Sequence, residues 1–175
     1  IIRGLVGSEM CIRDSKYAAD QSVDLRGGVL TPGLMDGHAH LIGYADGLLE
    51  ANLFGTTSWE DAVERVIQQQ AEWPSEWAVG RGWDQNDWDS QAFPDRALLD
   101  ATFPDQPVAL ERIDGHALIV NGEALRRAGL LSGAVPVVEG GEVMLDAGGV
   151  PTGVLIDNAC GLVSSIIPPH PEPRR

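Results

Sequence analysis

The sequence predicts an α/β protein in which short strands alternate with helices. Residues 77–83 and 107–112 are short, mostly apolar runs followed by polar residues, as expected for strands. The residues after Thr57 follow the 3.6-residue period of an amphipathic helix. Glycine pairs within residues 137–156 mark the turns of a β-hairpin or meander. Strands, helices and turns in this succession favour a mixed α/β fold.

The clearest helix is expected directly after Thr57 or Ser58, either of which can cap it. Thr57 and Glu60 have the spacing of a capping box. The apolar positions recur at intervals of three and four residues and form one stripe: Trp59, Ala62, Val63, Val66 and Ile67. Asp61 and Arg65 are spaced for an ion pair worth about 0.3–0.5 kcal/mol. We therefore assign this helix a structural role.

Four further helices are predicted from local signals. Residues 41–54 are apolar enough to form one, and a short helix is expected to open at Phe93-Pro94-Asp95. Asn121 is expected to cap another helix, which Gly129 ends. Residues 157–163 are expected to form a last short helix.

The composition limits the classes of partner. The chain has 175 residues, 43% of them hydrophobic, which is enough for one domain with a core. Its net charge of −14 argues against nucleic acid and against an anionic membrane as partners. No apolar run approaches the roughly 20 residues needed to cross a bilayer. Cys11 and Cys160 form no disulfide or zinc-binding pattern. Together, the composition, the charge and the cysteine usage suggest a cytoplasmic protein.

The first part of the chain does not have the pattern of a native domain. Residues 1–15 show no helical or strand period, and their back-translation resembles a sequencing-library adapter. We interpret them as a non-native leader; a short native leader is the alternative. Two short strands are expected within residues 22–30, around the turn Arg26-Gly27-Gly28.

A His-x-His motif is the main candidate for a functional site. His38 and His40 follow a short apolar run, and in a strand the two imidazoles point to the same face. Two converging imidazoles begin a site for zinc or a similar metal. Asp36 would point to the same side and could orient them. A simple packed or exposed histidine pair is the alternative.

Four motifs follow one another along the chain. They are Pro32-Gly33-Leu34-Met35-Asp36-Gly37-His38-Ala39-His40, Gly80-Arg81-Gly82-Trp83-Asp84, Arg112-Ile113-Asp114-Gly115-His116-Ala117 and Pro151-Thr152-Gly153-Val154-Leu155-Ile156-Asp157-Asn158-Ala159. Their order resembles that of the amidohydrolase superfamily. The resemblance is strongest to the family 3 branch, which includes N-substituted formamide deformylase-like proteins, and it covers about residues 22–169.

This resemblance implies a domain arrangement. The chain would be an incomplete piece of a (β/α)8 metal-dependent hydrolase barrel, cut at both ends. Its expected parts are a β-sandwich remnant (residues 16–32), the first barrel strand with its helix (33–54), a large α/β insertion (55–170) and a tail (171–175). Further metal ligands and the catalytic acid/base are expected in later barrel strands.

The resemblance also implies a chemistry. His38 and His40 would be ligands of one or two divalent metals, typically zinc, with Asp36 orienting them. Metal-activated water would hydrolyse a non-peptide C–N bond, and an acid/base residue would protonate the leaving nitrogen. Trp83, Arg112 and His116 are the candidates for a substrate-facing wall. For Trp83 the alternative is a packed core residue, for His116 a structural histidine, and for Asp36 a residue that forms hydrogen bonds at the end of the strand.

Several alternatives stay open from the sequence. The expected substrate is a small amide or formamide, and a homo-oligomer is possible at full length. A deaminase or cyclic amidase of the same superfamily would share the His-x-His strand. The chain by itself is expected to be inactive, either as a fragment or as a module that associates with another polypeptide, because two histidines leave zinc short of its usual three or four ligands.

Overall fold

The computed structural model describes residues 24–29, 33, 44 and 47–169. The chain divides into two units, residues 1–39 and 40–175, which are considered separately. In the first unit, the predicted turn is present: Arg26 and Gly27 have positive φ angles of 49° and 83°, and the Gly28 N–H donates to the Leu25 carbonyl at 2.8 Å. No strand is present within residues 24–29, so the prediction of two strands around this turn is wrong for these six residues.

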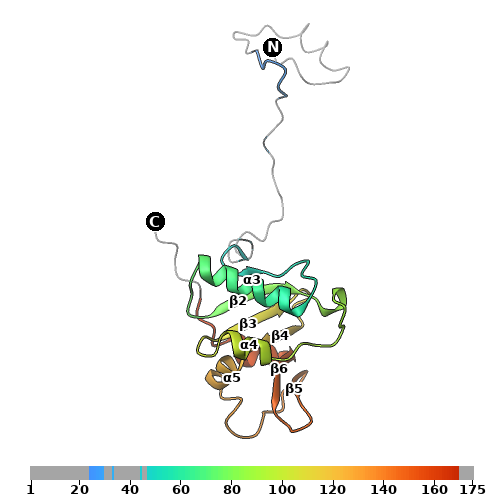
Figure 1. The fold of residues 1–175 in the computed structure, drawn as a ribbon, viewed down its shortest axis with the longest axis vertical. Helices are drawn as coiled ribbons and strands as arrows, with labels where there is room; N and C mark the ends of the chain where they lie inside the picture. Colours follow the sequence, from blue (N-terminus) through green and yellow to red (C-terminus); the bar gives the residue numbers. More distant parts are fainter. Residues whose placement is uncertain (1–23, 30–32, 34–43, 45–46, 170–175) are drawn as a thin grey trace. The chain divides into compact units, whose positions relative to one another are not determined.

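The second unit is built on a six-stranded mixed sheet (Figure 1). In chain order, its strands are β1 (Ala51–Asn52), β2 (Ala78–Trp83), β3 (Val108–Arg112), β4 (Ala117–Val120), β5 (Gly141–Leu145) and β6 (Pro151–Asp157). The spatial order is β1-β2-β3-β4-β6-β5. Strands β1 to β3 are parallel, and the remaining neighbours pair antiparallel. The α/β class predicted from the sequence is therefore confirmed.

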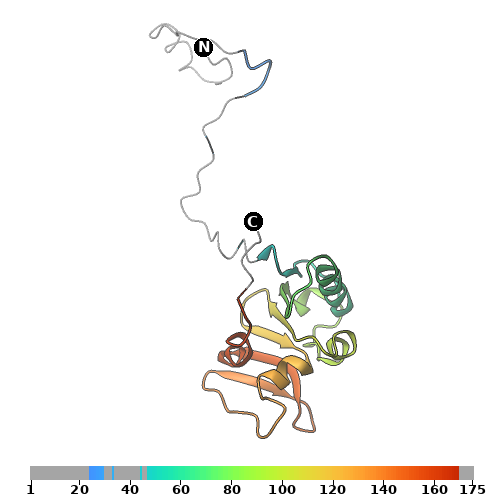
Figure 2. The same ribbon diagram turned by 90° about the vertical axis from the view of Figure 1, so that its left-hand side faces the viewer.

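Helices cover both faces of this sheet (Figures 1 and 2). They are α3 (Trp59–Glu72), α4 (Ala97–Thr102), α5 (Gly122–Arg127) and α6 (Gly161–Ser164), with short 3-10 turns at Gln85–Asp87 and Asn158–Cys160. Residues of α3 and α4 share one core cluster with Leu110 and Val154, while residues of α5 and α6 share the other with Ala109 and Leu155. Because neighbouring residues of a strand face opposite sides, each strand supplies both clusters.

The start of α3 shows how local sequence sets an element. Ser58 is the N-cap, and its side chain accepts the Asp61 N–H at 3.0 Å, while Asp61 accepts the Thr57 N–H at 3.0 Å. The capping pair is thus Ser58 with Asp61, and the predicted pairing of Thr57 with Glu60 is wrong. The predicted Asp61–Arg65 ion pair is present at 3.4 Å. The Thr57 N–H and, to a smaller extent, Arg65 lower the pKa of Asp61.

Two strands were not predicted from the sequence. Strand β1 occupies part of residues 41–54, which were expected to be helical. Strand β4 occupies residues 117–120, to which the sequence analysis assigned no element. Both strands are short, and β4 is fully buried between β3 and β6, so its four apolar residues give no alternating pattern.

Gly82 introduces a β-bulge that changes the direction of Trp83. The β2–β3 register shifts between Arg81 and Trp83, and Gly82 has a φ of 106°. The extra residue moves Trp83 to the face that carries Leu110.

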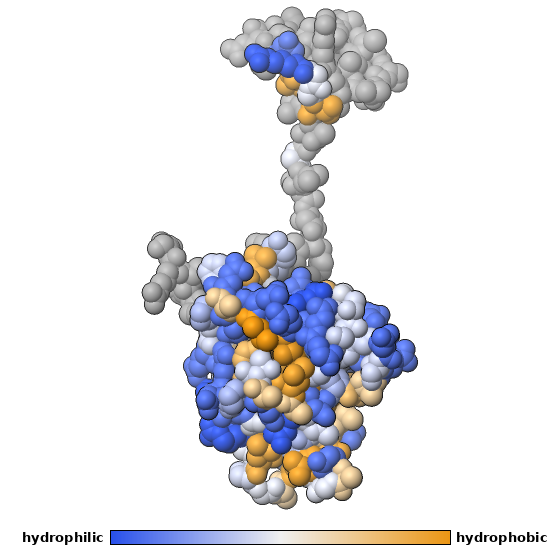
Figure 3. Space-filling view, viewed as in Figure 1, coloured by the Kyte–Doolittle hydropathy of each residue, from blue (hydrophilic) through white to orange (hydrophobic). Residues whose placement is uncertain are grey.

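On the outside, apolar side chains form a band across the face that carries α3 and α4 (Figure 3).

Candidate functional site at the carboxyl ends of the strands

The topology gathers polar residues at one end of the sheet. Strands β2, β3 and β6 run in the same direction, and β4 runs the opposite way. The carboxyl ends of β2, β3 and β6 therefore meet the amino end of β4. We call the polar residues found there the strand-end cluster: Asp84, Gln85, Arg112, Asp114, His116 and Asp157. In open α/β sheets, ligands bind outside the carboxyl ends of parallel strands.

Arg112 joins the loops that follow β2 and β3. Its Nε–H donates to Oε1 of the buried Gln85 at 2.9 Å, and its Nη2 donates to Oδ1 of Asp84 at 3.2 Å. Its Nη1 donates to Asp114, and the guanidinium lies 6.0 Å from the centre of the Phe93 ring. Only 16% of the Arg112 side chain is exposed. All three guanidinium nitrogens are thus engaged by the protein, which makes Arg112 an organiser of this surface.

His116 is more open and has one ring nitrogen fixed. Its Nδ1 lies 2.8 Å from Oδ1 of Asp157, and its backbone N–H donates to Oδ1 of Asp114 at 3.0 Å. The side chain is 72% exposed. A carboxylate can only accept, so this contact favours the tautomer with the proton on Nδ1, in which Nε2 is an acceptor. The cluster therefore presents an oriented imidazole to solvent.

Asp157 holds its position at a cost in backbone energy. It has φ 48° and ψ −123°, a conformation that residues with a Cβ rarely adopt. It lies at the end of β6, directly before the turn that leads into α6. Its N–H donates to the His116 carbonyl at 2.9 Å, so backbone and side chain both hold the pair together. A strained turn between strand and helix projects a side chain above the end of a sheet.

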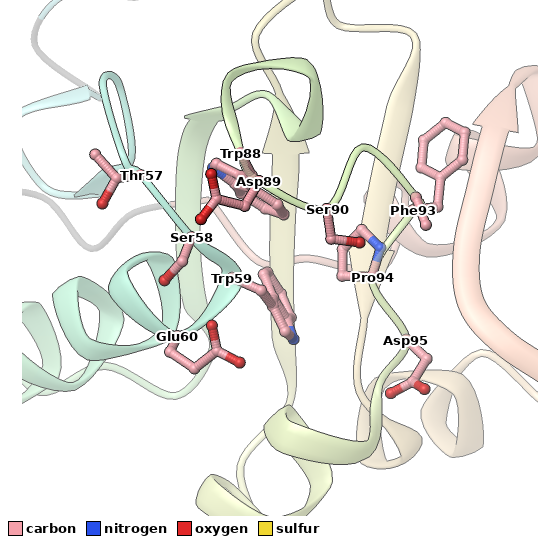
Figure 4. A pocket seen from close by; sticks show the side chains of 11 residues that line it. Thr57, Ser58, Trp59, Glu60, Trp88, Asp89, Ser90, Phe93, Pro94 and Asp95 are labelled. Carbon is pink, nitrogen blue, oxygen red and sulfur yellow. The ribbon is translucent and has the colours of Figure 1, made fainter.

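A pocket of about 460 Å³ lies beside this cluster (Figure 4). The start of α3 contributes Ser58, Trp59 and Glu60, and the loop after β2 contributes residues 88–90 and 92–95. Trp59 and Trp88 have ring centres 6.0 Å apart, which gives the pocket an aromatic wall with carboxylates around it. Phe93 links the pocket to the cluster through its contact with Arg112.

Trp83 lies beneath the pocket. Its side chain has no exposed surface, and its Nε1–H donates to the Leu110 carbonyl at 2.8 Å. The rings of Trp88 and Phe93 cover it at 6.1 and 6.2 Å. The structure therefore places Trp83 in the core and not on a wall open to substrate. A packed core residue was the alternative given for Trp83 in the sequence analysis. Trp88 and Phe93 are instead among the residues that line the pocket.

The predicted metal ligands cannot be placed. His38, His40 and Asp36 lie outside the described residues. Within the described part of the chain, no group of three or more histidine, cysteine, aspartate or glutamate side chains is arranged to hold a metal ion. The helices of that part include none long and apolar enough to span a membrane.

Some members of the cluster were not predicted. Asp84, Gln85, Asp114 and Asp157 were not proposed as site residues, although Asp84 directly follows β2 and Asp157 is the last residue of β6. A polar residue at the end of an apolar strand was the available signal in the sequence.

Cys160 lies near Asp157. Burial raises the pKa of the Cys160 thiol, and the charge of Asp157 raises it further.

Comparison with known proteins identifies the family. The model of an amidohydrolase family matches residues 21–174. The chain is 36% identical over 157 residues to YtcJ of Bacillus subtilis, which is named as an amidohydrolase, and 33% identical over 162 residues to LONG AFTER FAR-RED 3 of Arabidopsis thaliana. It is 28% identical over 165 residues to an N-substituted formamide deformylase of Arthrobacter pascens. These matches cover 88–92% of this chain but only 27–30% of the relatives.

Solved structures agree with these matches. A metal-dependent hydrolase of Pyrococcus furiosus superposes with a TM-score of 0.56 at 28% identity, over 91% of this chain and 30% of that one. A hydrolase of Pyrococcus horikoshii, at 24% identity, shares the fold with a TM-score of 0.51 over 74% of this chain and 23% of its own. The chain therefore spans less than a third of the proteins it matches. From these matches, and above all from the family model that spans most of its length, we conclude that the chain belongs to the amidohydrolase family.

Proposed function

We propose that this chain contributes the first metal-binding strand and part of the substrate-binding surface of a metal-dependent amidohydrolase that acts on small amides or formamides. The observation that carries this proposal is the family match over residues 21–174, which includes the His38-Ala39-His40 motif. The match to an N-substituted formamide deformylase supports a non-peptide C–N bond as the target.

Each residue has a separate task in this proposal. His38 and His40 would hold the metal, and Asp36 would accept a hydrogen bond from one of them and fix its orientation. A divalent ion such as zinc, bound with further ligands, would lower the pKa of a bound water and polarise the substrate carbonyl. Arg112 would keep the loops after β2 and β3 in place, and His116 would face the substrate.

The test measures bound metal and amide hydrolysis by the protein encoded by the whole gene. Metal content is determined after purification with zinc, and hydrolysis is followed with N-formyl and N-acyl amines. We expect the His38→Ala, His40→Ala double variant to lose the metal and to reduce hydrolysis at least about a thousandfold, since the reaction needs the activated water. His170→Ala, in the proline-rich tail, is the matched control and should keep both properties.

Full metal content in the double variant would contradict the assignment of the two histidines. A wild-type protein that binds metal but releases no amine from any amide would contradict the substrate class. Deamination of a heterocyclic amine by that protein would instead support the deaminase alternative.

A further inference from the structure

The side-chain contact between His116 and Asp157 contributes little to the stability of the fold. Both side chains lie at the surface, 72% and 49% exposed, so their contact buries little. Exposed ion pairs add little to stability. The backbone of Asp157, by contrast, is held in a conformation that is strained for a residue with a Cβ.

Glycine would remove that cost. It adopts positive φ angles without strain, and two nearby positions of this region, Gly149 and Gly153, already use it with φ angles of 78° and 102°. The chain instead carries a carboxylate at position 157, and this carboxylate faces an imidazole. Strained backbone conformations of this kind are concentrated at functional sites, where a side chain must keep one orientation.

The hydrogen bond to Asp157 determines which ring nitrogen of His116 is free. The Nδ1–H donates to Asp157, and Nε2 has no hydrogen-bond partner among the described residues. A network running from Asp84 through Arg112 and Asp114 fixes the backbone of His116 at the same time. The free acceptor atom therefore has a fixed position at the carboxyl end of the parallel strands, where ligands of such sheets bind.

We propose that Asp157 is a positioning residue that holds His116 in its Nδ1–H tautomer, and that Nε2 of His116 accepts a hydrogen bond from the N–H of a secondary amide substrate. This inference rests on the proposed function and names the group of the substrate that the cluster recognises. It requires no proton transfer. Secondary amides are bound through this hydrogen bond, whereas tertiary amides, which have no N–H, are bound without it.

The tautomer is tested on the 175-residue chain by long-range ¹H–¹⁵N NMR of the histidine rings. We expect the neutral His116 ring to show a protonated Nδ1 and an unprotonated Nε2. In Asp157→Gly the preference should be lost, while the unfolding midpoint stays equal or rises because the backbone strain is relieved. Asp157→Asn, which keeps an acceptor oxygen, should retain the preference. A wild-type ring with its proton on Nε2 would overturn the proposal.

The substrate contact is tested on the protein encoded by the whole gene. The probes are the N-formyl derivative of a primary amine, which is a secondary amide and is measured by KM, and its N-methyl analogue, a tertiary amide measured as a competitive inhibitor. We expect His116→Ala to raise the KM of the secondary amide about tenfold, as the loss of one hydrogen bond implies, and to leave the inhibition constant of the analogue unchanged. His116→Gln offers an acceptor oxygen at similar reach and should stay within about threefold of the wild type.

The outcomes separate this inference from the proposed function. If the wild type hydrolyses the secondary amide and His116→Ala weakens both probes equally, or neither, the inference is wrong and the proposed function stands. If the wild type hydrolyses no amide, the proposed function fails and the substrate contact fails with it.

Discussion

The side-chain oxygen of Asn121 accepts the backbone N–H of Val108 at 3.0 Å and thereby ties the start of α5 to the start of β3. The same oxygen caps α5 by accepting the Ala124 N–H, and the amide nitrogen donates to the carbonyls of Phe103 and Gln106, both at 2.8 Å. Asn121 has no exposed surface. A single buried amide thus satisfies four backbone groups of three segments.

Replacing Asn121 should be among the most damaging changes in the described part of the chain. Asn121→Ala leaves these four groups without their partner, and we expect the free energy of unfolding to fall by about 3 kcal/mol. Urea denaturation measures the loss. Asn86→Ala is the control, because Asn86 is exposed and its side chain bonds, among the described residues, only to Asp84 two positions earlier. Equal losses in both variants would mean that the Asn121 network contributes little.

Gly82 and Gly133 offer a matched pair for backbone strain and contact. Both have a φ of 106°. A Cβ at Gly133 would meet no atom within 4 Å, whereas one at Gly82 would lie 2.5 Å from the Phe54 ring. We expect Gly133→Ala to cost about 1–2 kcal/mol from strain alone and Gly82→Ala about 2–4 kcal/mol. Similar unfolding midpoints for the two variants would show that Phe54 moves aside freely.

The pH dependence of stability should include a contribution from Glu123. Hydrogen bonds from Arg126 and Arg127 lower the pKa of this carboxyl from 4.5 to about 2. Since the folded-state pKa lies below the unfolded one, the contribution is complete above pH 4.5 and disappears as the pH falls toward 2. Glu123→Gln should therefore lower the urea midpoint at neutral pH and have a much smaller effect at pH 2. A difference that is the same at both pH values would exclude this ionisation as its origin. Added salt should reduce the neutral-pH difference, because the arginines are partly exposed.

Cys160 should react slowly with alkylating reagents. Burial and the nearby Asp157 carboxylate raise the pKa of its thiol, so less thiolate is present at any given pH. In a Cys11→Ser background, where Cys160 is the single thiol, iodoacetamide should react more slowly than with an unfolded peptide. Asp157→Asn should speed the reaction at a fixed pH. A rate equal to that of the peptide would show that the folded chain does not shield the sulfur.

The sequence by itself determined the features that depend on neighbours a few residues apart. The helix after Ser58, the Asn121 cap and the Asp61–Arg65 pair all join residues three or four positions apart, and all are present. The hairpin of β5 and β6 likewise follows from its glycine turns. The motif that contains His38 and His40 indicated the family, which the family model confirms.

The tertiary structure decided what depends on distant residues. His116 and Asp157 are 41 positions apart, and they meet because β4 pairs with β6 in a register that sets Ala117 opposite Ile156. Strand β4 itself is too short and too uniformly apolar to be distinguished from a loop or helix by periodicity. The bulge at Gly82 turned Trp83 into the core, because one extra residue exchanges the two faces of a strand. Chain-local interactions fix caps and turns, whereas strand order and register fix which polar side chains share a site.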